Sequence, residues 1–445
     1  MILLWLTEAL PLAVTALLGP VLAVVFGVAP VRPAFASFAD PVIFVFLGGF
    51  ILAEAMFVHG VDRRIAYSVL SIKAVGASAW RILAVYGGIT LLLSMWMSNT
   101  ATTAMMFPIG LSLATHLARR GAAGARNFAL ATMLMTSFAA SIGGLATPVG
   151  TPPNLIGIGM LERLAGVHIT FVQWMALGVP AAALLFVFVV MHLGLAGARG
   201  THLYEDSAQI VYEELRKLGS LTRGQRNVLI AFGTTVALWL LPGIVALSGM
   251  EQRPIASALR QALPESVAAM IGALLLFVLP IDWRKRRFTL QWDEALQIDW
   301  GVILLYGGGL AMGELAFSTG LAGAVGSGIA SWLPSHTVTS LTLLFTATAT
   351  VLSEVTSNTA TANMIVPVAI AVAQSSGVSP LEPALGATLG ASLGFMMPVS
   401  TPPNAIVYSS GYVPITAMMR SGIMLDIVGS IVIAAVVLFL TPLVL

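Results

Sequence analysis

Long runs of apolar residues, separated by short polar segments, follow one another along the whole 445-residue chain. Most runs are long enough to cross the ~30 Å hydrocarbon core of a bilayer as a helix. Their apolar residues are continuous and do not alternate with polar ones, which excludes a transmembrane β-barrel. The pattern predicts an all-α polytopic membrane protein with apolar blocks at residues 3–28, 42–58, 82–97, 101–117, 127–160, 171–195, 227–247, 265–281, 300–317, 339–356, 361–375, 381–411 and 418–444.

Composition supports a membrane protein and argues against an enzyme. Hydrophobic residues make up 58% of the chain and charged residues only 9%, against about 25% charged residues in soluble domains. The absence of cysteine from the sequence removes disulfides, thiolate metal sites and cysteine nucleophiles. The sequence contains no glycine-rich phosphate loop, HExxH pattern or nucleophile elbow. We therefore expect neither enzymatic activity nor a nucleic-acid partner.

The first 28 residues form the first apolar block. They are too long and too apolar for a cleaved signal peptide, and they lack a positively charged start. The sequence predicts one membrane helix of the mature protein here.

Two pairs of blocks are shorter than full membrane spans. Residues 82–97 pair with 101–117, and residues 339–356 pair with 361–375. Each arm would be only ~25 Å long at 1.5 Å per residue. A Ser-Asn-Thr triplet separates the arms in both pairs, at residues 98–100 and 357–359. The pattern predicts two re-entrant hairpins with these triplets at their tips.

The distribution of basic residues supports the hairpins, because a hairpin returns the chain to the side that it left. With both hairpins re-entrant, 17 of the 21 basic residues lie on one side, and the other side receives only Arg32, Arg163, Arg253 and Arg260. The positive-inside rule makes the rich side cytoplasmic. We expect a multi-pass protein of the cell (inner) membrane, with the first hairpin open to the cytoplasm, the second open to the outside, and the C-terminus outside.

The second half of the chain repeats motifs of the first half in the same order. Three motifs recur, at offsets of 260, 259 and 250 residues: Gly48, Gly49 and Glu54 as Gly308, Gly309 and Glu314; Ser98–Thr100 as Ser357–Thr359; and Thr151–Asn154 as Thr401–Asn404. Hairpins of opposite insertion in related halves indicate an inverted repeat. The first half has one apolar block fewer before its Gly-Gly motif, so we expect a native start upstream of Met1 or a shortened variant.

The repeat predicts five segments. They are scaffold helices of repeat 1 (1–81), a transport-domain part of repeat 1 with the cytoplasm-facing hairpin and a broken helix (82–195), a cytoplasmic amphipathic linker (196–226), scaffold helices of repeat 2 (227–335), and a transport-domain part of repeat 2 with the outside-facing hairpin and a broken helix (336–445). Within the linker, the pattern of residues 202–226 predicts a surface helix.

The tips and the two Thr-Pro-Pro-Asn segments carry the candidate binding residues. Irregular backbone at membrane depth is tolerated where it lines a polar cavity. Adjacent prolines break a helix and free its carbonyl groups, and broken helices at matching places of inverted repeats indicate a midplane substrate site. Helix capping by the triplets and simple proline kinks are the structural alternatives. The recurrence of each motif in both halves argues against both alternatives.

The charge inventory favours a cation-coupled site for an anion. No basic residue falls near a tip or a broken segment, and hydroxyl and amide oxygens suit a hard cation such as Na⁺. Ser94 and Ser353 lie one turn before the tip serines and extend the oxygen set on the same face. Glu354 is an intramembrane acid beside the second tip, and for it, as for Glu54 and Glu314, functional and structural roles are both open.

At these motifs the sequence resembles the divalent anion/sodium symporter family, whose members move dicarboxylates, citrate or sulfate. The resemblance covers nearly the whole chain and includes Trp5, Thr7 and Glu8 at an early helix junction. It implies a homodimer with a scaffold and a transport domain that moves as an elevator. It also implies Na⁺ sites at Ser94, Ser98, Asn99 and Gly150 and at Ser353, Thr356, Asn358 and Ser400, and substrate contacts at Asn99, Thr100, Thr151, Asn358, Thr359, Thr401 and Pro402.

The leading hypothesis is a secondary transporter that couples Na⁺ flow to uptake of a C4-dicarboxylate such as succinate. It needs no cofactor, with Na⁺ as the coupling ion. A Na⁺-independent dicarboxylate exchanger and a carrier of sulfate or another oxyanion are the alternatives. A channel would need a continuous polar pore instead of two tips that meet at one site.

Overall fold

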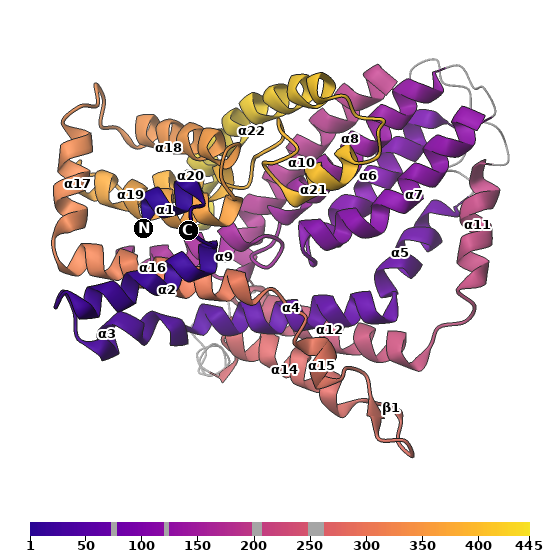
Figure 1. Cartoon of the computed structure of the whole chain (residues 1–445), viewed down its shortest axis with the longest axis horizontal. Helices are drawn as coiled ribbons and strands as arrows, with labels where there is room; N and C mark the ends of the chain where they lie inside the picture. The colour runs from indigo at the N-terminus through magenta and orange to yellow at the C-terminus, as the bar shows by residue number, and fades with distance from the viewer. Residues whose placement is uncertain (73–77, 120–123, 198–206, 248–261) are drawn as a thin grey trace.

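The structure, a computed structural model, describes residues 1–72, 78–119, 124–197, 207–247 and 262–445 (Figure 1). Some sequence expectations concern residues outside these ranges: the basic residues Lys73, Arg120, Arg199, Arg253 and Arg260, and residues 198–206 of the expected linker. The described chain is α-helical apart from one two-stranded antiparallel sheet, formed by β1 (Pro280–Asp282) and β2 (Arg287–Phe288). The sequence did not predict this sheet.

Five helical segments of the described chain are long and apolar enough to cross a membrane. They are Val31–His59, Phe171–Gly197, Arg223–Val245, Trp300–Ser318 and Ile415–Val444. Much of their surface is apolar and exposed, as expected for contact with lipid. Together they make the chain a multi-pass membrane protein.

The prediction of a single helix over the first 28 residues is wrong. Helix α1 (Ile2–Thr7) ends at Glu8, which has a positive φ of 47°, and α2 (Leu12–Val25) begins after Pro11. A proline disfavours helical backbone at the residue before it, so the helix cannot continue through Leu10. Hydropathy did not show this break, which lies at the helix junction that the family resemblance implied at Trp5, Thr7 and Glu8.

The elements of the two halves match in order and often in length. Four pairs have equal lengths: α2 and α14 (Glu265–Val278) with 14 residues, α4 (Pro41–His59) and α16 (Trp300–Ser318) with 19, α5 (Val61–Leu70) and α17 (Leu321–Ala330) with 10, and α6 (Ala79–Ser94) and α18 (Val338–Ser353) with 16. Helix caps match as well. Asp40 and Asp299 accept hydrogen bonds from the backbone N–H groups of Val42 and Val302 at the starts of α4 and α16.

Short turns join two helices at both places where a hairpin was predicted, and irregular segments follow α8 and α20 at both predicted breaks, whereas the re-entrant insertion stays a prediction. In the first half, α6 leads into α7 (Asn99–Arg119), and α8 (Ala125–Gly144) is separated from α9 (Pro152–Ala165) by an irregular segment. In the second half, α18 leads into α19 (Asn358–Ser375), and α20 (Leu381–Gly390) is separated from α21 (Pro402–Tyr408). Each half ends with a long helix, α10 (Phe171–Gly197) or α22 (Ile415–Val444).

The predicted linker helix is shorter than expected. Its described part, α11 (Ser207–Lys217), packs against α5, and residues 223–226 already belong to α12 (Arg223–Leu247). Short helices complete the chain: α3 (Val31–Ala36), the 3₁₀-helix η1 (Ser37–Ala39) and α15 (Trp292–Ala295). The predicted domain boundaries stay a prediction.

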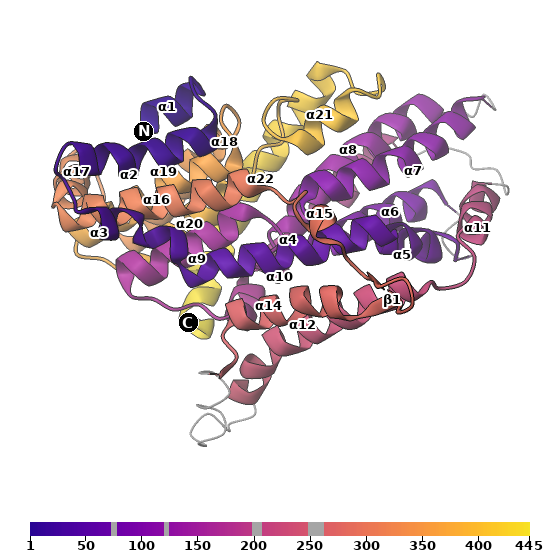
Figure 2. The same ribbon diagram turned by 60° about the horizontal axis from the view of Figure 1, so that its bottom comes forward.

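The core lies where the two halves interlock. Helix α8 is buried along most of its length and packs against α6, α7 and α10. The half-helix α9 packs against α19 and α20, whereas α21 packs against α7 and α8 (Figures 1 and 2). Each half-helix that follows a break therefore contacts the hairpin of the other half. The paired helices α2 with α16 and α4 with α14 border this core.

Candidate substrate and cation site

The first tip joins the end of α6 to the start of α7. The Oγ of Ser94 donates to Oδ1 of Asn99 at 2.8 Å, which fixes the amide across the turn. The Oγ of Ser98 accepts from the backbone N–H of Ala101 at 3.2 Å. Ser98 thus caps α7, as the structural alternative proposed. Ser94 is buried, Asn99 is half-buried, and Ser98 and Thr100 are exposed.

The second tip repeats this arrangement. The Oγ of Ser353 donates to Oδ1 of Asn358 at 2.7 Å, and the Oγ of Ser357 accepts from the backbone N–H of Ala360 at 3.2 Å. The Oγ of Ser353 also lies 2.7 Å from the carbonyl oxygen of Ala391, at the start of the second break. The serine of each triplet therefore caps a helix, and the asparagine presents an oriented amide. Asn358 and Thr359 are both half-buried.

An asparagine closes each broken segment. The Nδ2 of Asn154 donates to the carbonyls of Gly144 and Thr147, both at 2.8 Å. The Nδ2 of Asn404 donates to the equivalent carbonyls of Gly394 and Met397, both at 3.0 Å. Both asparagines are fully buried. Their structural role was missed from the sequence, although their recurrence directly after Pro-Pro was the available signal.

The first break lies directly against the first tip. A Cβ at Gly144 would lie 2.6 Å from Oδ1 of Asn99 and 3.1 Å from the Cβ of Thr151, so only glycine allows this approach. A Cβ at Gly150 would similarly lie 2.6 Å from the carbonyl oxygen of Gly144. The structure therefore brings together Ser94, Asn99, Gly150 and Thr151 of the predicted site.

The second break differs from the first in some of its contacts. A Cβ at Gly394 would lie 3.5 Å from Oδ1 of Asn358, which again places the break beside the tip. The Oγ of Ser400, however, donates to the Glu354 carboxylate at 2.6 Å and lies 3.0 Å from the backbone carbonyl oxygen of Glu354.

Three other predicted residues of the second half lie apart from this pairing. The hydroxyl of Thr356 lies 2.7 Å from that of Thr361. The Oγ1 of Thr401 accepts from the backbone N–H of Asn404 at 3.4 Å, and Pro402 is exposed. The described contacts therefore do not join Thr356 to Ser353 or Asn358.

Buried contacts connect the tip and break of the first half with those of the second half. The Oγ of Ser137 on α8 donates to Oδ1 of Asn404 on α21. Phe138 and Phe395 meet edge to face with ring centroids 5.2 Å apart. A residue that closes one break thus also binds the broken helix of the other half. The tips and breaks of both halves therefore belong to one packed core.

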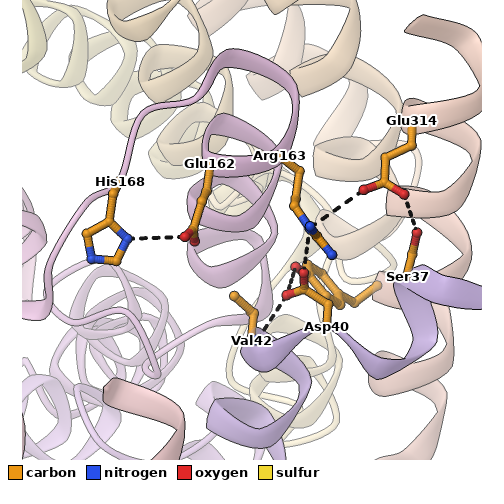
Figure 3. A network of polar contacts seen from close by, with 8 residues as sticks. Ser37, Asp40, Val42, Glu162, Arg163, His168 and Glu314 are labelled. Carbon is orange, nitrogen blue, oxygen red and sulfur yellow. Dashed lines mark hydrogen bonds and ion pairs between the residues drawn. The ribbon is translucent and has the colours of Figure 1, made fainter. Parts of the chain in front are cut away.

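A polar network ties the half-helix α9 to α4 and α16 (Figure 3). The Nε of Arg163 donates to Oδ2 of Asp40 at 2.9 Å and lies 3.6 Å from a carboxylate oxygen of Glu314. Ser37 donates to Glu314 at 2.7 Å, and the hydroxyl of Tyr306 donates to Asp40 at 3.0 Å. This network gives Glu314 a structural partner and lies at the far end of α9 from the break.

One more ion pair lies beside this network. His168, in the loop after α9, contacts Glu162 at 3.3 Å, and this hydrogen bond raises the pKa of His168 above its ordinary value. Both side chains are well exposed to solvent, so the pair adds little stability.

A cavity of about 410 Å³ lies elsewhere, between the end of α4 and the segment that follows α11. Glu54, His59, Arg63 and Gln225 are among its lining residues, and none of the predicted site residues is. Glu54 therefore borders this cavity and not the tips.

Comparison with known proteins identifies the family of the chain. The family described as "Sodium:sulfate symporter transmembrane region" matches residues 1–445. The chain belongs to this divalent anion/sodium symporter family. It is a transporter and not an enzyme.

Two curated relatives carry the name sodium-dependent dicarboxylate transporter SdcS. The protein of Staphylococcus saprophyticus is 33% identical over 452 residues, covering 98% of this chain and 84% of the relative. The protein of Staphylococcus aureus strain USA300 is 32% identical over 448 residues, covering 99% and 84%.

A solved structure shares the fold at low sequence identity. The Alcanivorax borkumensis YdaH transporter, described as having an unusual topology, superposes with a TM-score of 0.59 at 14% identity, covering 92% of this chain and 86% of that one. This likeness supports a transporter fold for the chain.

Proposed function

We propose that this symporter-family protein couples inward Na⁺ flow to uptake of a C4-dicarboxylate such as succinate. The observation that carries the proposal is the doubled arrangement of a serine-fixed tip asparagine beside a broken helix. The names of the SdcS relatives support Na⁺ and a dicarboxylate as its ligands.

The proposed site must neutralise a dianion without a basic side chain. Helices α7 and α19 begin at the tips, and α9 and α21 begin after the breaks. Helix N-termini favour anions because of unpaired N–H groups and the helix dipole. Bound Na⁺ would supply the remaining positive charge, since burying an unpaired charge costs several kcal/mol.

The proposed ligands of Na⁺ and of the substrate come from the tip and break of each half. One Na⁺ would use Ser94, Ser98, Asn99 and Gly150, and a second would use Ser353, Thr356, Asn358 and Ser400. The substrate carboxylates would contact Asn99, Thr100, Thr151, Asn358, Thr359, Thr401 and Pro402. We include Thr356 although its hydroxyl pairs with Thr361, because its backbone carbonyl could still serve.

The proposal extends to the assembly. In this proposal the two halves are inverted repeats, the tips face each other from opposite sides of the membrane, and the C-terminus lies outside. The protein would be a homodimer in the cell membrane, and the transport domain of each protomer would slide against its scaffold as an elevator. The recurrence of the two helix turns and two breaks in the same order, with equal lengths in four helix pairs, supports the repeat.

Sulfate is the second candidate substrate, because the description of the matching family names it. Sulfate and succinate are both dianions, so a site neutralised by helix dipoles and Na⁺ could accept either. Competition of sulfate with labelled succinate distinguishes these substrates.

The test is uptake of radiolabelled succinate into proteoliposomes of the purified protein. We expect uptake to rise sigmoidally with external Na⁺, because more than one cation would bind with each dianion, and to fall to background when choline replaces Na⁺. Excess sulfate should leave uptake unchanged. Full uptake or exchange in choline would contradict Na⁺ coupling and favour the exchanger. Strong inhibition by sulfate would favour the oxyanion carrier.

A further inference from the structure

The hairpin formed by β1 and β2 carries four consecutive basic residues, which are Arg284, Lys285, Arg286 and Arg287. All four are exposed, and no other four consecutive residues of the sequence are all basic. The hairpin directly follows α14 and projects beyond α14 and α15 (Figure 1). In the first half, the segment between α2 and α4 contains only one basic residue, Arg32. The repeat therefore does not account for this basic hairpin.

The tip of the basic hairpin is shaped by its own backbone. The Oδ1 of Asp282 accepts hydrogen bonds from the backbone N–H groups of Arg284 at 3.0 Å and Lys285 at 3.2 Å. The backbone N–H of Arg286, which has a positive φ of 50°, donates to the carbonyl of Trp283 at 3.2 Å. Within the described residues, no ion pair joins any of the four basic side chains to an acid. Their charges are therefore available to a partner outside the chain.

The base of the basic hairpin is fixed to the ends of α12 and α14. The Nδ2 of Asn227, a buried residue of α12, donates to the carbonyl of Pro280 at 3.2 Å and to the Oγ1 of Thr289 at 2.9 Å. The backbone N–H of Thr289 donates to the carbonyl of Leu279, directly after α14, at 3.0 Å. These bonds set the position of the hairpin along α14.

The surroundings of the basic hairpin are those of a membrane–water interface. Val278, the last residue of α14, is 65% exposed and lies two residues before β1, so an apolar surface suited to lipid extends to the hairpin. Trp283 in the hairpin and Trp292 after it are 73% and 63% exposed. Tryptophan side chains are enriched at the level of the lipid headgroups. The four basic residues therefore lie where headgroup phosphates would be.

We propose that the basic hairpin binds the headgroups of anionic phospholipids, such as phosphatidylglycerol, in the leaflet that the positive-inside rule makes cytoplasmic. Basic clusters directly beside a membrane helix attract anionic lipids. Arginine suits this partner because its planar guanidinium binds two phosphate oxygens at once. The exposed apolar end of α14 and the two tryptophans favour a lipid over a soluble anion, since acyl chains would cover them.

Native mass spectrometry of the purified protein in detergent tests the proposal, because it resolves each bound lipid by its mass. The protein is titrated with phosphatidylglycerol or with phosphatidylcholine of the same acyl chains. The hairpin variant replaces its four basic residues by glutamine. The matched control loses the same charge at four other exposed basic residues, through Arg63→Gln, Arg81→Gln, Arg126→Gln and Arg216→Gln.

We expect the parent protein and the control to bind phosphatidylglycerol about tenfold more tightly than phosphatidylcholine, because several basic residues contribute together. The hairpin variant should bind both lipids about equally. If that variant does not fold, Arg284→Gln with Lys285→Gln and Arg286→Gln with Arg287→Gln should each lose part of the preference.

Three results would overturn the proposal. They are an unchanged preference in the hairpin variants, an equal loss in the control, which would mean that binding follows total charge, and displacement of phosphatidylglycerol by excess inorganic phosphate, which would mean a site for soluble anions. The measurement requires neither Na⁺ nor uptake. The lipid site and the proposed function can therefore fail independently.

Discussion

Replacing Asn99 or Asn358 by alanine is expected to lower succinate uptake by about a hundredfold or more, while expression and folding stay near those of the parent protein. Each asparagine is half-buried, and its oxygen already accepts a hydrogen bond from the serine that precedes the tip. In the proposed site the amide serves both a cation and a carboxylate. Hydrogen bonds to charged groups are worth about 1.5–3 kcal/mol each, and each 1.36 kcal/mol is tenfold in rate.

The matched control for this experiment is Asn227→Ala. Asn227 is a buried asparagine of α12 that donates to Thr289 at 2.9 Å, outside the proposed site. This variant should lose thermal stability and keep its uptake per folded molecule. Uptake and stability are measured on the same purified samples. Parent-like uptake by both tip variants would mean that the triplets are helix caps and nothing more.

A short thiol-reactive cross-linker between cysteines at positions 163 and 314 is expected to block uptake almost completely. Arg163 on α9 lies 3.6 Å from Glu314 on α16, and the sequence assigns these helices to the transport and scaffold parts. If the transport domain slides against the scaffold, this contact must separate in every cycle. The sequence contains no cysteine, so Arg163→Cys with Glu314→Cys can be introduced without background labelling.

The control pair for the cross-link is Glu162→Cys with His168→Cys. These residues also contact each other, at 3.3 Å, and both lie at the end of α9 and its following loop (Figure 3). Cross-linking them should leave uptake near that of the unlinked protein. Release by a cleavable linker should restore uptake in the 163–314 variant. Normal uptake with the 163–314 link complete would contradict the sliding domain.

The hairpins and breaks could be predicted because they interrupt apolar runs with polar or proline residues. Hydropathy alone misplaced the end of α6 by a few residues, since Met95, Trp96 and Met97 continue the apolar run beyond Ser94. The same continuity concealed the break after α1. Helices α5 and α17 were missed because both are only 10 residues long and lie outside the predicted blocks.

The contacts between distant segments could not be predicted from the sequence. The Arg163–Asp40 bond spans 123 residues, and nothing local in the chain distinguishes these residues from other charged ones. The Ser137–Asn404 hydrogen bond depends on how α8 and α21 pack. Glu354 was visible as an intramembrane acid beside a tip, but its hydrogen bonds with Met396 and Ser400 were not. The recurrence of Asn154 as Asn404 was visible, and only the fold shows that these residues close the breaks.

The central claim is that Na⁺ and the dianion bind one coupled site. Titration calorimetry of the purified protein tests it most directly, with succinate added in Na⁺ or in choline, and Na⁺ added with or without succinate. Thermodynamic linkage requires that each ligand tighten the other by the same factor, and we expect that factor to be about tenfold or more. Succinate binding of equal affinity in Na⁺ and choline would contradict the account.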